Sequence, residues 1–112
     1  MNRLLSTILG VAFVLGVSTG PALAQSRAPV ATKNVSVVNF AFMPKTATIT
    51  RGTTVKWKNT TATTTHTTTS NTGLWNKTLA PGATFSRTFN RAGTFRYHCT
   101  IHPSMTGSIV VS

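Results

Sequence analysis

The sequence predicts a small all-β domain, and three observations support that prediction. From residue 35 onward, short runs of Val, Ile, Thr and aromatic residues alternate with Gly, Pro and Asn. Such runs are typical of strands and turns in a sandwich or barrel. No segment keeps a helical period over a length that would make a stable helix. The chain is also short, at 112 residues, which allows one compact core and no second domain.

The first 24 residues are expected to be a secretory signal peptide rather than part of this domain. Residues 1–3 carry a positive charge, residues 4–17 are mostly apolar, and residues 22–24 read Ala-Leu-Ala, which matches a cleavage site. A membrane-spanning helix needs about 20 apolar residues, so this shorter run predicts export without a membrane span. We therefore expect the mature chain, residues 25–112, to fold and acquire any metal in the periplasm.

Within the exported chain, residues 25–33 are expected to be an N-terminal segment and residues 34–112 the folded domain. Gly and Pro predict turns at residues 51–52, 81–82 and 92–93. The candidate strands between such breaks are residues 34–42, 47–50, 53–59, 66–70, 84–90, 94–99 and 107–111.

Alternation along these strands predicts which side chains share a face. In the strand 94–99, Phe95, Tyr97 and Cys99 fall on one side, while Arg96 and His98 fall on the other. His98 therefore points away from the neighbouring thiol, and we interpret it as a surface histidine. The same alternation predicts an inner face made of Val55, Trp57, Phe85, Phe89, Ile109 and Val111.

The charge balance excludes several kinds of chemistry. The chain has 11 Lys and Arg and no Asp or Glu, and ten of these cations remain once residues 1–24 are removed. Glycoside hydrolysis, two-metal phosphoryl transfer and carboxylate-built calcium sites all need acidic side chains. Nucleic acid would suit the positive charge, but export makes such an encounter improbable, and we expect no nucleic-acid partner.

One segment concentrates soft metal ligands. The chain has a single Cys, which cannot form a disulfide within the chain, so its thiol is either a liability or a ligand. Cys99, His102 and Met105 follow one another at three-residue intervals. One Cys, two His and a weak axial Met form the trigonal site that holds copper for electron transfer. Because His98 points away from the thiol, His66 is the candidate for the second imidazole.

The segment 93–107, together with residues 55–59 leading to His66, resembles the cupredoxins. The short Cys-x-x-His-x-x-Met loop looks most like that of amicyanin among the plastocyanin-like members, and the resemblance covers nearly all of residues 34–112. It implies a cupredoxin-like Greek-key β-sandwich of about seven to eight strands and one type 1 copper per chain. It also implies equatorial ligation by His66, Cys99 and His102, with Met105 as the axial ligand.

The resemblance has two further implications for the surroundings of the copper. Amicyanin-like sequences commonly have Pro before the first His ligand and Asn after it, where this chain has Thr65 and Thr67. We expect the Thr67 hydroxyl to take the place of the Asn amide. In the family, the ring edge of the loop histidine, here His102, reaches the surface within an apolar patch. The corresponding rim residues here would be Ala80, Pro81 and Pro103.

The function that follows is a one-electron carrier, not an enzyme. We expect a monomer that meets an acidic redox partner, such as a cytochrome or a dehydrogenase. A periplasmic copper carrier or scavenger is the alternative, because it would use the same ligands but release the metal. A copper enzyme would need a second metal centre or an open position, and only His98 is left over. Zinc would suit a Cys-His-His set, but a thioether is a poor zinc ligand.

Overall fold

The computed structural model describes residues 29–112, and this part of the chain contains strands and no helix. The predictions for residues 1–24, and for the segment up to residue 28, lie outside the described residues. None of the described residues belongs to a helix that could span a membrane. The nine strands are β1 (Thr32–Val38), β2 (Ala41–Met43), β3 (Thr46–Ile49), β4 (Thr53–Asn59), β5 (His66–Ser70), β6 (Asn76–Leu79), β7 (Thr84–Phe89), β8 (Gly93–His98) and β9 (Thr106–Val111).

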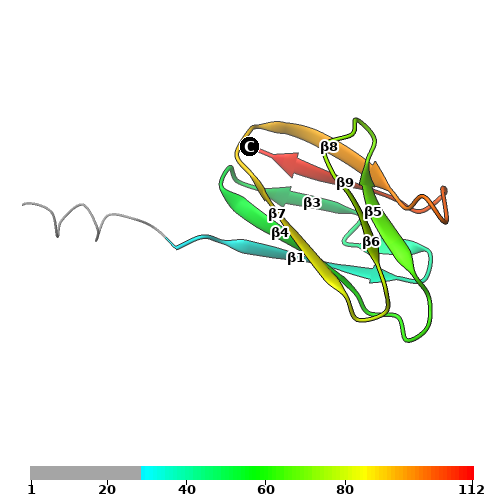
Figure 1. Ribbon diagram of the computed structural model, residues 1–112. Coiled ribbons are helices and arrows are strands. Elements are labelled where there is room, and N and C mark those ends of the chain that lie inside the picture. Colours follow the sequence, from blue (N-terminus) through cyan, green and yellow to red (C-terminus); the bar gives the residue numbers. More distant parts are fainter. Residues whose placement is uncertain (1–28) are drawn as a thin grey trace, which may run out of the picture.

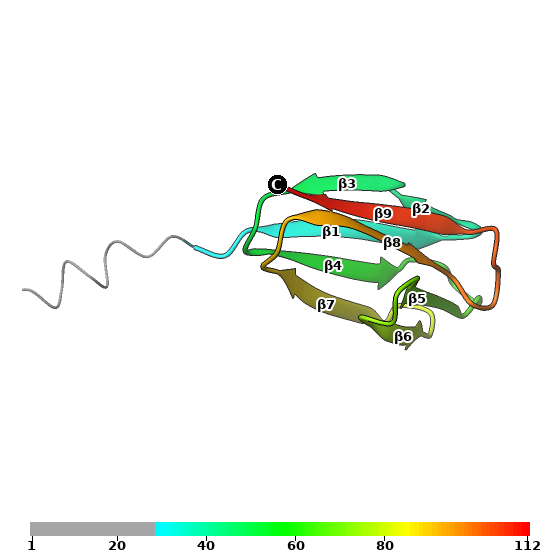
Figure 2. The ribbon, with the colours of Figure 1, turned by 90° about the horizontal axis from the view of Figure 1, so that it is seen from above.

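The strands form two sheets that pack as a sandwich (Figures 1 and 2). One sheet has the order β2-β1-β4-β7, and the other has the order β3-β9-β8-β5-β6. Two neighbouring pairs are parallel, β1 with β4 and β3 with β9, and the remaining pairs are antiparallel. The prediction of an all-β sandwich is confirmed, and its strand count of seven to eight is close to the nine observed.

The two additional strands have local physical causes. The expected strand 34–42 is divided into β1 and β2, because Asn39 and Phe40 form a turn and Phe40 has a φ of 68°. The strand β6 was not predicted because its first three residues are all exposed and only Leu79 is buried. It lies at the edge of its sheet, where one neighbouring strand is enough and no alternating pattern is required.

The core between the sheets is built around Trp57. Its ring lies 5.5 Å from the ring of Tyr97, 5.6 Å from that of Trp75 and 5.8 Å from that of Phe85, measured between centroids. Aromatic rings at these separations contribute packing energy beyond the area they bury. The predicted inner face is confirmed, because its members are either buried or packed against the core: Val55, Trp57, Phe85, Phe89, Ile109 and Val111. The three residues predicted to share one side of their strand also belong to this core: Phe95, Tyr97 and Cys99.

The sandwich has two ends that differ in what they carry. The loop between β8 and β9, drawn in orange at the right of Figure 1, lies at the same end as the turn between β1 and β2. The turn that joins β7 to β8 lies at the opposite end. Since β8 runs from one end to the other, Cys99 emerges at the first end and Gly93 at the second. This arrangement separates the candidate ligands from the β7–β8 turn by the length of a strand.

Candidate metal centre

Three predicted ligands converge at the first end of the sandwich. The metal-binding atoms of His66, Cys99 and His102 all lie within 4.8 Å of one another. The Cys99 Sγ is 3.9 Å from His66 Nδ1 and 3.7 Å from His102 Nδ1. The chain brings these residues together from three places, which are the start of β5, the residue after β8 and the following loop.

The spacing of these donors suits a small metal ion. First-row metals bind imidazole nitrogen at about 2.0–2.1 Å and thiolate sulfur at about 2.3 Å. Two such ligands at about 120° around an ion are about 3.8 Å apart, by the geometry of those bond lengths. The two sulfur–nitrogen distances, 3.7 and 3.9 Å, agree with this value. A thiol and two imidazoles at this spacing are a donor set that fits one type 1 copper.

Cys99 is held by hydrogen bonds at its backbone amide and at its sulfur. Its side chain is fully buried, and its amide donates a hydrogen bond to the Met105 carbonyl at 3.0 Å. The backbone N–H of Thr67 donates to the Cys99 Sγ at 3.3 Å. This hydrogen bond ties the sulfur to the start of β5, next to His66.

His66 is buried and points one ring nitrogen at the thiol. Its other nitrogen, Nε2, donates to the Asn39 side-chain oxygen at 3.2 Å, so Nδ1 is left free to bind a metal. Burial, and secondarily the charge of His102, lowers the pKa of His66 below its ordinary value of 6.5. Both effects keep this imidazole neutral, which is the protonation state that a ligand needs.

His102 is only half-buried, and the ring of Phe40 packs against it. The two ring centroids are 5.0 Å apart with an interplanar angle of 80°, an edge-to-face contact. Phe40 is 65% exposed even though it is a large apolar residue, and its backbone occupies the left-handed region. An aromatic residue in that conformation costs about 1–3 kcal/mol and is found mainly where function requires it. Ile101, which is 50% exposed, adds a second apolar side chain to this surface.

The loop from Cys99 to Met105 closes on itself. The Met105 amide donates to the His102 carbonyl at 2.9 Å, and the Met105 carbonyl accepts from Cys99. The Met105 side chain is buried in the same hydrophobic cluster as Cys99. These contacts place Met105 beside the thiol along the backbone, and its role as the axial ligand remains a prediction. Of the expected rim residues, Ala80, Pro81 and Pro103 are all exposed.

The Thr67 hydroxyl contacts the residue that follows Cys99. The Thr67 Oγ1 accepts a hydrogen bond from the Thr100 amide at 2.8 Å and lies 3.2 Å from the Thr100 hydroxyl. Thr100 directly follows Cys99, so this pair joins β5 to the ligand loop. The replacement of the family's Asn by Thr67 remains a prediction.

His98 lies outside the three-donor group, as the alternation predicted. It is half-buried, and its Nδ1 is 2.6 Å from the side-chain oxygen of Asn71. Among the described residues, the only group of three or more His, Cys or acidic side chains able to hold a metal is that of His66, Cys99 and His102.

Sequence reasoning missed two residues that shape the site, Asn39 and Phe40. Both were assigned to the middle of a single strand, where their side chains would alternate between the faces. The available signal was Asn39, since Asn is common in turns and tolerates unusual backbone angles. Nothing in the sequence placed Phe40 against His102, because that contact depends on how the β1–β2 turn meets a loop 62 residues later.

Comparison with known proteins agrees with this geometry. Residues 6–111 match the family model described as a cupredoxin-like domain. No curated protein matches the chain. A purple cupredoxin from Nitrosopumilus maritimus is 28% identical, with a TM-score of 0.65 over 70% of this chain and 98% of that one. A reduced amicyanin variant is 29% identical, with a TM-score of 0.64 over 80% of this chain and 89% of that one.

Part of a larger enzyme has a similar structure. The copper-containing nitrite reductase NirK from Thermus scotoductus SA-01 is 30% identical over 86% of this chain, with a TM-score of 0.68. The matched region is only 27% of that enzyme chain. The likeness therefore concerns one portion of the enzyme and supports the fold described above.

Proposed function

The chain belongs to the cupredoxin-like domain family, and from this premise we propose that it is a periplasmic type 1 copper protein that carries single electrons between redox partners. We propose His66, Cys99 and His102 as the equatorial ligands and Met105 as the axial ligand. When bound there, copper would supply a centre that alternates between Cu(II) and Cu(I).

The observation that carries this proposal is the arrangement of the donors. Both Nδ1 atoms lie 3.7 to 3.9 Å from the thiol sulfur, and contacts to Asn39, Thr67 and the loop backbone hold the donors there. Donors held by hydrogen bonds of the fold itself need to move little when the charge of the metal changes. A small rearrangement favours fast electron transfer, whereas a copper scavenger that releases its metal benefits from a site that can open.

The half-buried ring of His102 is the proposed route for electrons. It is the most exposed of the three donors, the exposed ring of Phe40 packs against it, and its chain neighbour Ile101 is also exposed. An apolar surface excludes water when a partner docks and lets two redox centres approach closely. His66 and Cys99 are fully buried, so they would bind the copper without forming part of the docking surface.

Charge is the proposed basis of partner choice. The exported chain would carry ten Lys and Arg and no acidic side chain, so an acidic cytochrome or dehydrogenase would be attracted from a distance. Electrostatic steering can raise association rates by about 10- to 1,000-fold, and salt weakens it because the screening length is about 8 Å at physiological ionic strength. We propose a monomer that docks transiently.

The visible spectrum of the copper-loaded protein tests this function directly. We expect a strong thiolate-to-copper absorption band with Cu(II), its loss on reduction and its return on reoxidation, with slow loss of copper to a chelator. A colourless Cu(II) protein would contradict the type 1 site. A coloured protein that gives up copper within seconds would instead support the scavenger.

Electron transfer to partner proteins tests the carrier role. The second-order rate should be higher with an acidic cytochrome than with a basic one at low salt, and this advantage should shrink as salt is added. Equal rates with both cytochromes, independent of salt, would mean that the charge has no part in partner choice.

The absence of enzymatic activity is a separate expectation, and the likeness to a portion of NirK makes nitrite the substrate to try first. With a chemical electron donor, the copper-loaded protein should reduce nitrite no faster than its Cys99→Ser variant. A clear excess over that variant would make the protein an enzyme.

A further inference from the structure

The end of the sandwich opposite the ligands carries a groove lined by arginines. Two adjoining hollows of about 280 and 520 Å³ share Leu74, Arg91 and Phe95 in their walls. Arg87 lines the smaller hollow, and Arg96 lines the larger one. We call this surface, defined by Leu74, Arg87, Arg91, Phe95 and Arg96, the arginine groove.

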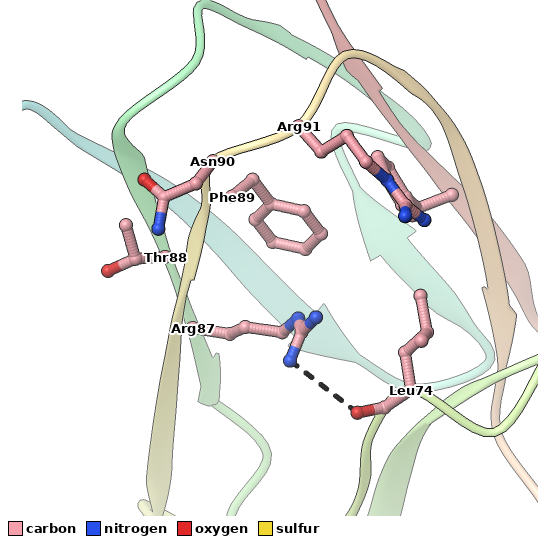
Figure 3. A pocket seen from close by; sticks show the side chains of 7 residues that line it. Leu74, Arg87, Thr88, Phe89, Asn90 and Arg91 are labelled. Atoms are coloured by element: carbon pink, nitrogen blue, oxygen red, sulfur yellow. Dashed lines mark hydrogen bonds between the residues drawn. The ribbon is translucent and has the colours of Figure 1, made fainter.

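Arg87 is held in position by aromatic rings. Its guanidinium carbon lies 5.4 Å from the centre of the Trp75 ring and 5.3 Å from that of Phe89. Its Nη1 donates a long hydrogen bond of 3.5 Å to the Leu74 carbonyl, drawn as a dashed line in Figure 3. Its Nε is buried and has no hydrogen-bond partner among the described residues. The guanidinium is thus oriented by stacking and keeps most of its hydrogen-bonding capacity.

The three arginines have no side-chain counter-charge within this protein. The sequence contains no Asp or Glu, so no acidic side chain of the chain can pair with them. Arg91 and Arg96 are exposed, and Figure 3 shows Arg91 at the top of the smaller hollow with Arg87 below it. Guanidinium groups pair with carboxylates through two parallel hydrogen bonds, which makes carboxylates well suited to this surface.

The apolar part of the groove adds a second requirement on the occupant. Leu74 is 40% exposed, and the Phe95 ring is half-buried against the core. A small inorganic anion would leave these side chains in water. A segment with carboxylates around one apolar side chain would satisfy the arginines and cover the apolar wall together.

We propose that the arginine groove docks an acidic segment of a partner protein, in which carboxylates flank one apolar or aromatic side chain. The proposed function enters this inference at one point, which is that the partner is a redox protein. The docking itself requires no copper. Phe95 lies four residues before Cys99 on β8, so the groove and the thiol are about 13 Å apart along the strand. The groove is therefore a surface separate from the exposed edge of His102.

A short synthetic peptide in which Glu residues flank one central Phe tests the proposal. Calorimetry would measure its affinity for the copper-loaded full chain, and amide chemical shifts would locate it. We expect the largest shifts at Leu74, Arg91, Phe95 and Arg96. Because single exposed ion pairs contribute about 0.2–1 kcal/mol, the Arg91→Gln/Arg96→Gln protein should bind about three- to tenfold more weakly.

The matched control is Lys56→Gln/Lys58→Gln, which removes the same charge from exposed positions on β4. It should weaken binding by less than about twofold, since only long-range attraction is lost. Replacing the central Phe of the peptide by Ala should also weaken binding. Equal weakening by both double variants, or no binding at all, would overturn the proposal.

Other occupants would show themselves in the same experiment. Inorganic phosphate that displaced the peptide at a similar concentration would reduce the groove to an unspecific anion site and overturn the proposal. Tighter binding of anionic lipid vesicles, lost in Arg91→Gln/Arg96→Gln, would overturn it in favour of a membrane surface. Peptide binding by Cys99→Ser distinguishes a failure of the proposed copper site from a failure of the proposed docking. Docking at the arginine groove should persist in this variant while the colour is lost.

Discussion

The two ends of the sandwich use polar groups in opposite ways. At the ligand end, hydroxyls, amides and carbonyls of the same chain pair with one another, as Thr67 does with Thr100 and His66 with Asn39. At the groove end, three guanidinium groups have no acidic side chain in the chain to pair with. The comparison teaches that internal hydrogen bonds hold the proposed metal donors at the ligand end, whereas the acidic segment proposed above would supply counter-charge at the groove end.

This difference follows from the composition. A chain without Asp or Glu cannot place carboxylates around its ligands, so it uses Thr and Asn to hold the loop that carries the thiol. The thiolate is then the only anion among the proposed ligands. The same lack of acids leaves the surface cations without an acidic side chain of this chain to pair with. One feature of the sequence thus gives an internally bonded site without carboxylates and a basic surface without acidic side chains to pair with it.

Removing the thiol should have the largest effect, and it should be confined to the ligand end. Cys99→Ser should abolish the visible band completely, because the transition requires a thiolate, while the apo-protein should still fold around its aromatic core. Absorption and far-UV circular dichroism would check the two expectations. A coloured Cys99→Ser protein would show that the site has been assigned to the wrong residues.

Gly107 tests how firmly the ligand loop is joined to the core. A Cβ at this position would lie 2.5 Å from the Tyr97 Cζ and 2.6 Å from its oxygen, and the Tyr97 ring is buried. Overpacking of this kind costs about 1–3 kcal/mol, so Gly107→Ala should lower the free energy of unfolding of the apo-protein by that amount. Urea denaturation would measure it. Thr106→Ala, at the exposed neighbouring position, should stay within about 0.5 kcal/mol of the wild type.

Thr67 tests the internal bonding of the ligand end. Thr67→Val keeps the shape of the side chain but leaves the Thr100 amide without its acceptor, which should cost about 1–2 kcal/mol. The absorption maximum and reduction potential should shift as well, because Thr100 follows Cys99. Thr54→Val removes a hydroxyl contact of 2.7 Å with Thr88 on the other sheet and should leave the spectrum unchanged. Identical spectra for both variants would contradict the role given to Thr67.

Acid should weaken the ligand end of the apo-protein through His66. Its pKa in the folded state lies below the ordinary value of 6.5, so the unfolded chain takes up a proton more readily. The contribution of His66 to stability is therefore constant above that value and declines as the pH falls from 6.5 toward the folded pKa. Urea denaturation across this range, compared with His66→Gln, would measure the slope. Stability that rises on acidification only when His66 is present would contradict the direction of the shift.

The fold and the three-donor group were predictable from the sequence for a specific reason. The strand alternation placed Cys99 inside and His98 outside, and the three-residue spacing put His102 in the loop that follows. Phe40 and the arginine groove were not predictable in this way. The groove joins Leu74, from the turn between β5 and β6, to arginines of β7, the β7–β8 turn and β8, and no period in the sequence links them.

His98 provides the smallest expected effect and the last test of the comparison, because it adjoins the thiol in the chain and contacts a residue of the groove wall. It precedes Cys99, yet its imidazole points to the opposite face and meets Asn71, a residue that also lines the larger hollow of the groove. His98→Ala should therefore leave the visible band unchanged and alter peptide affinity by less than about twofold, since the hydrogen bond that is lost lies within the protein and Asn71 is free to bond water instead. Absorption and calorimetry on the same sample would measure both. Loss of the band would place His98 among the ligands, whereas a large loss of peptide affinity would extend the arginine groove toward the metal centre.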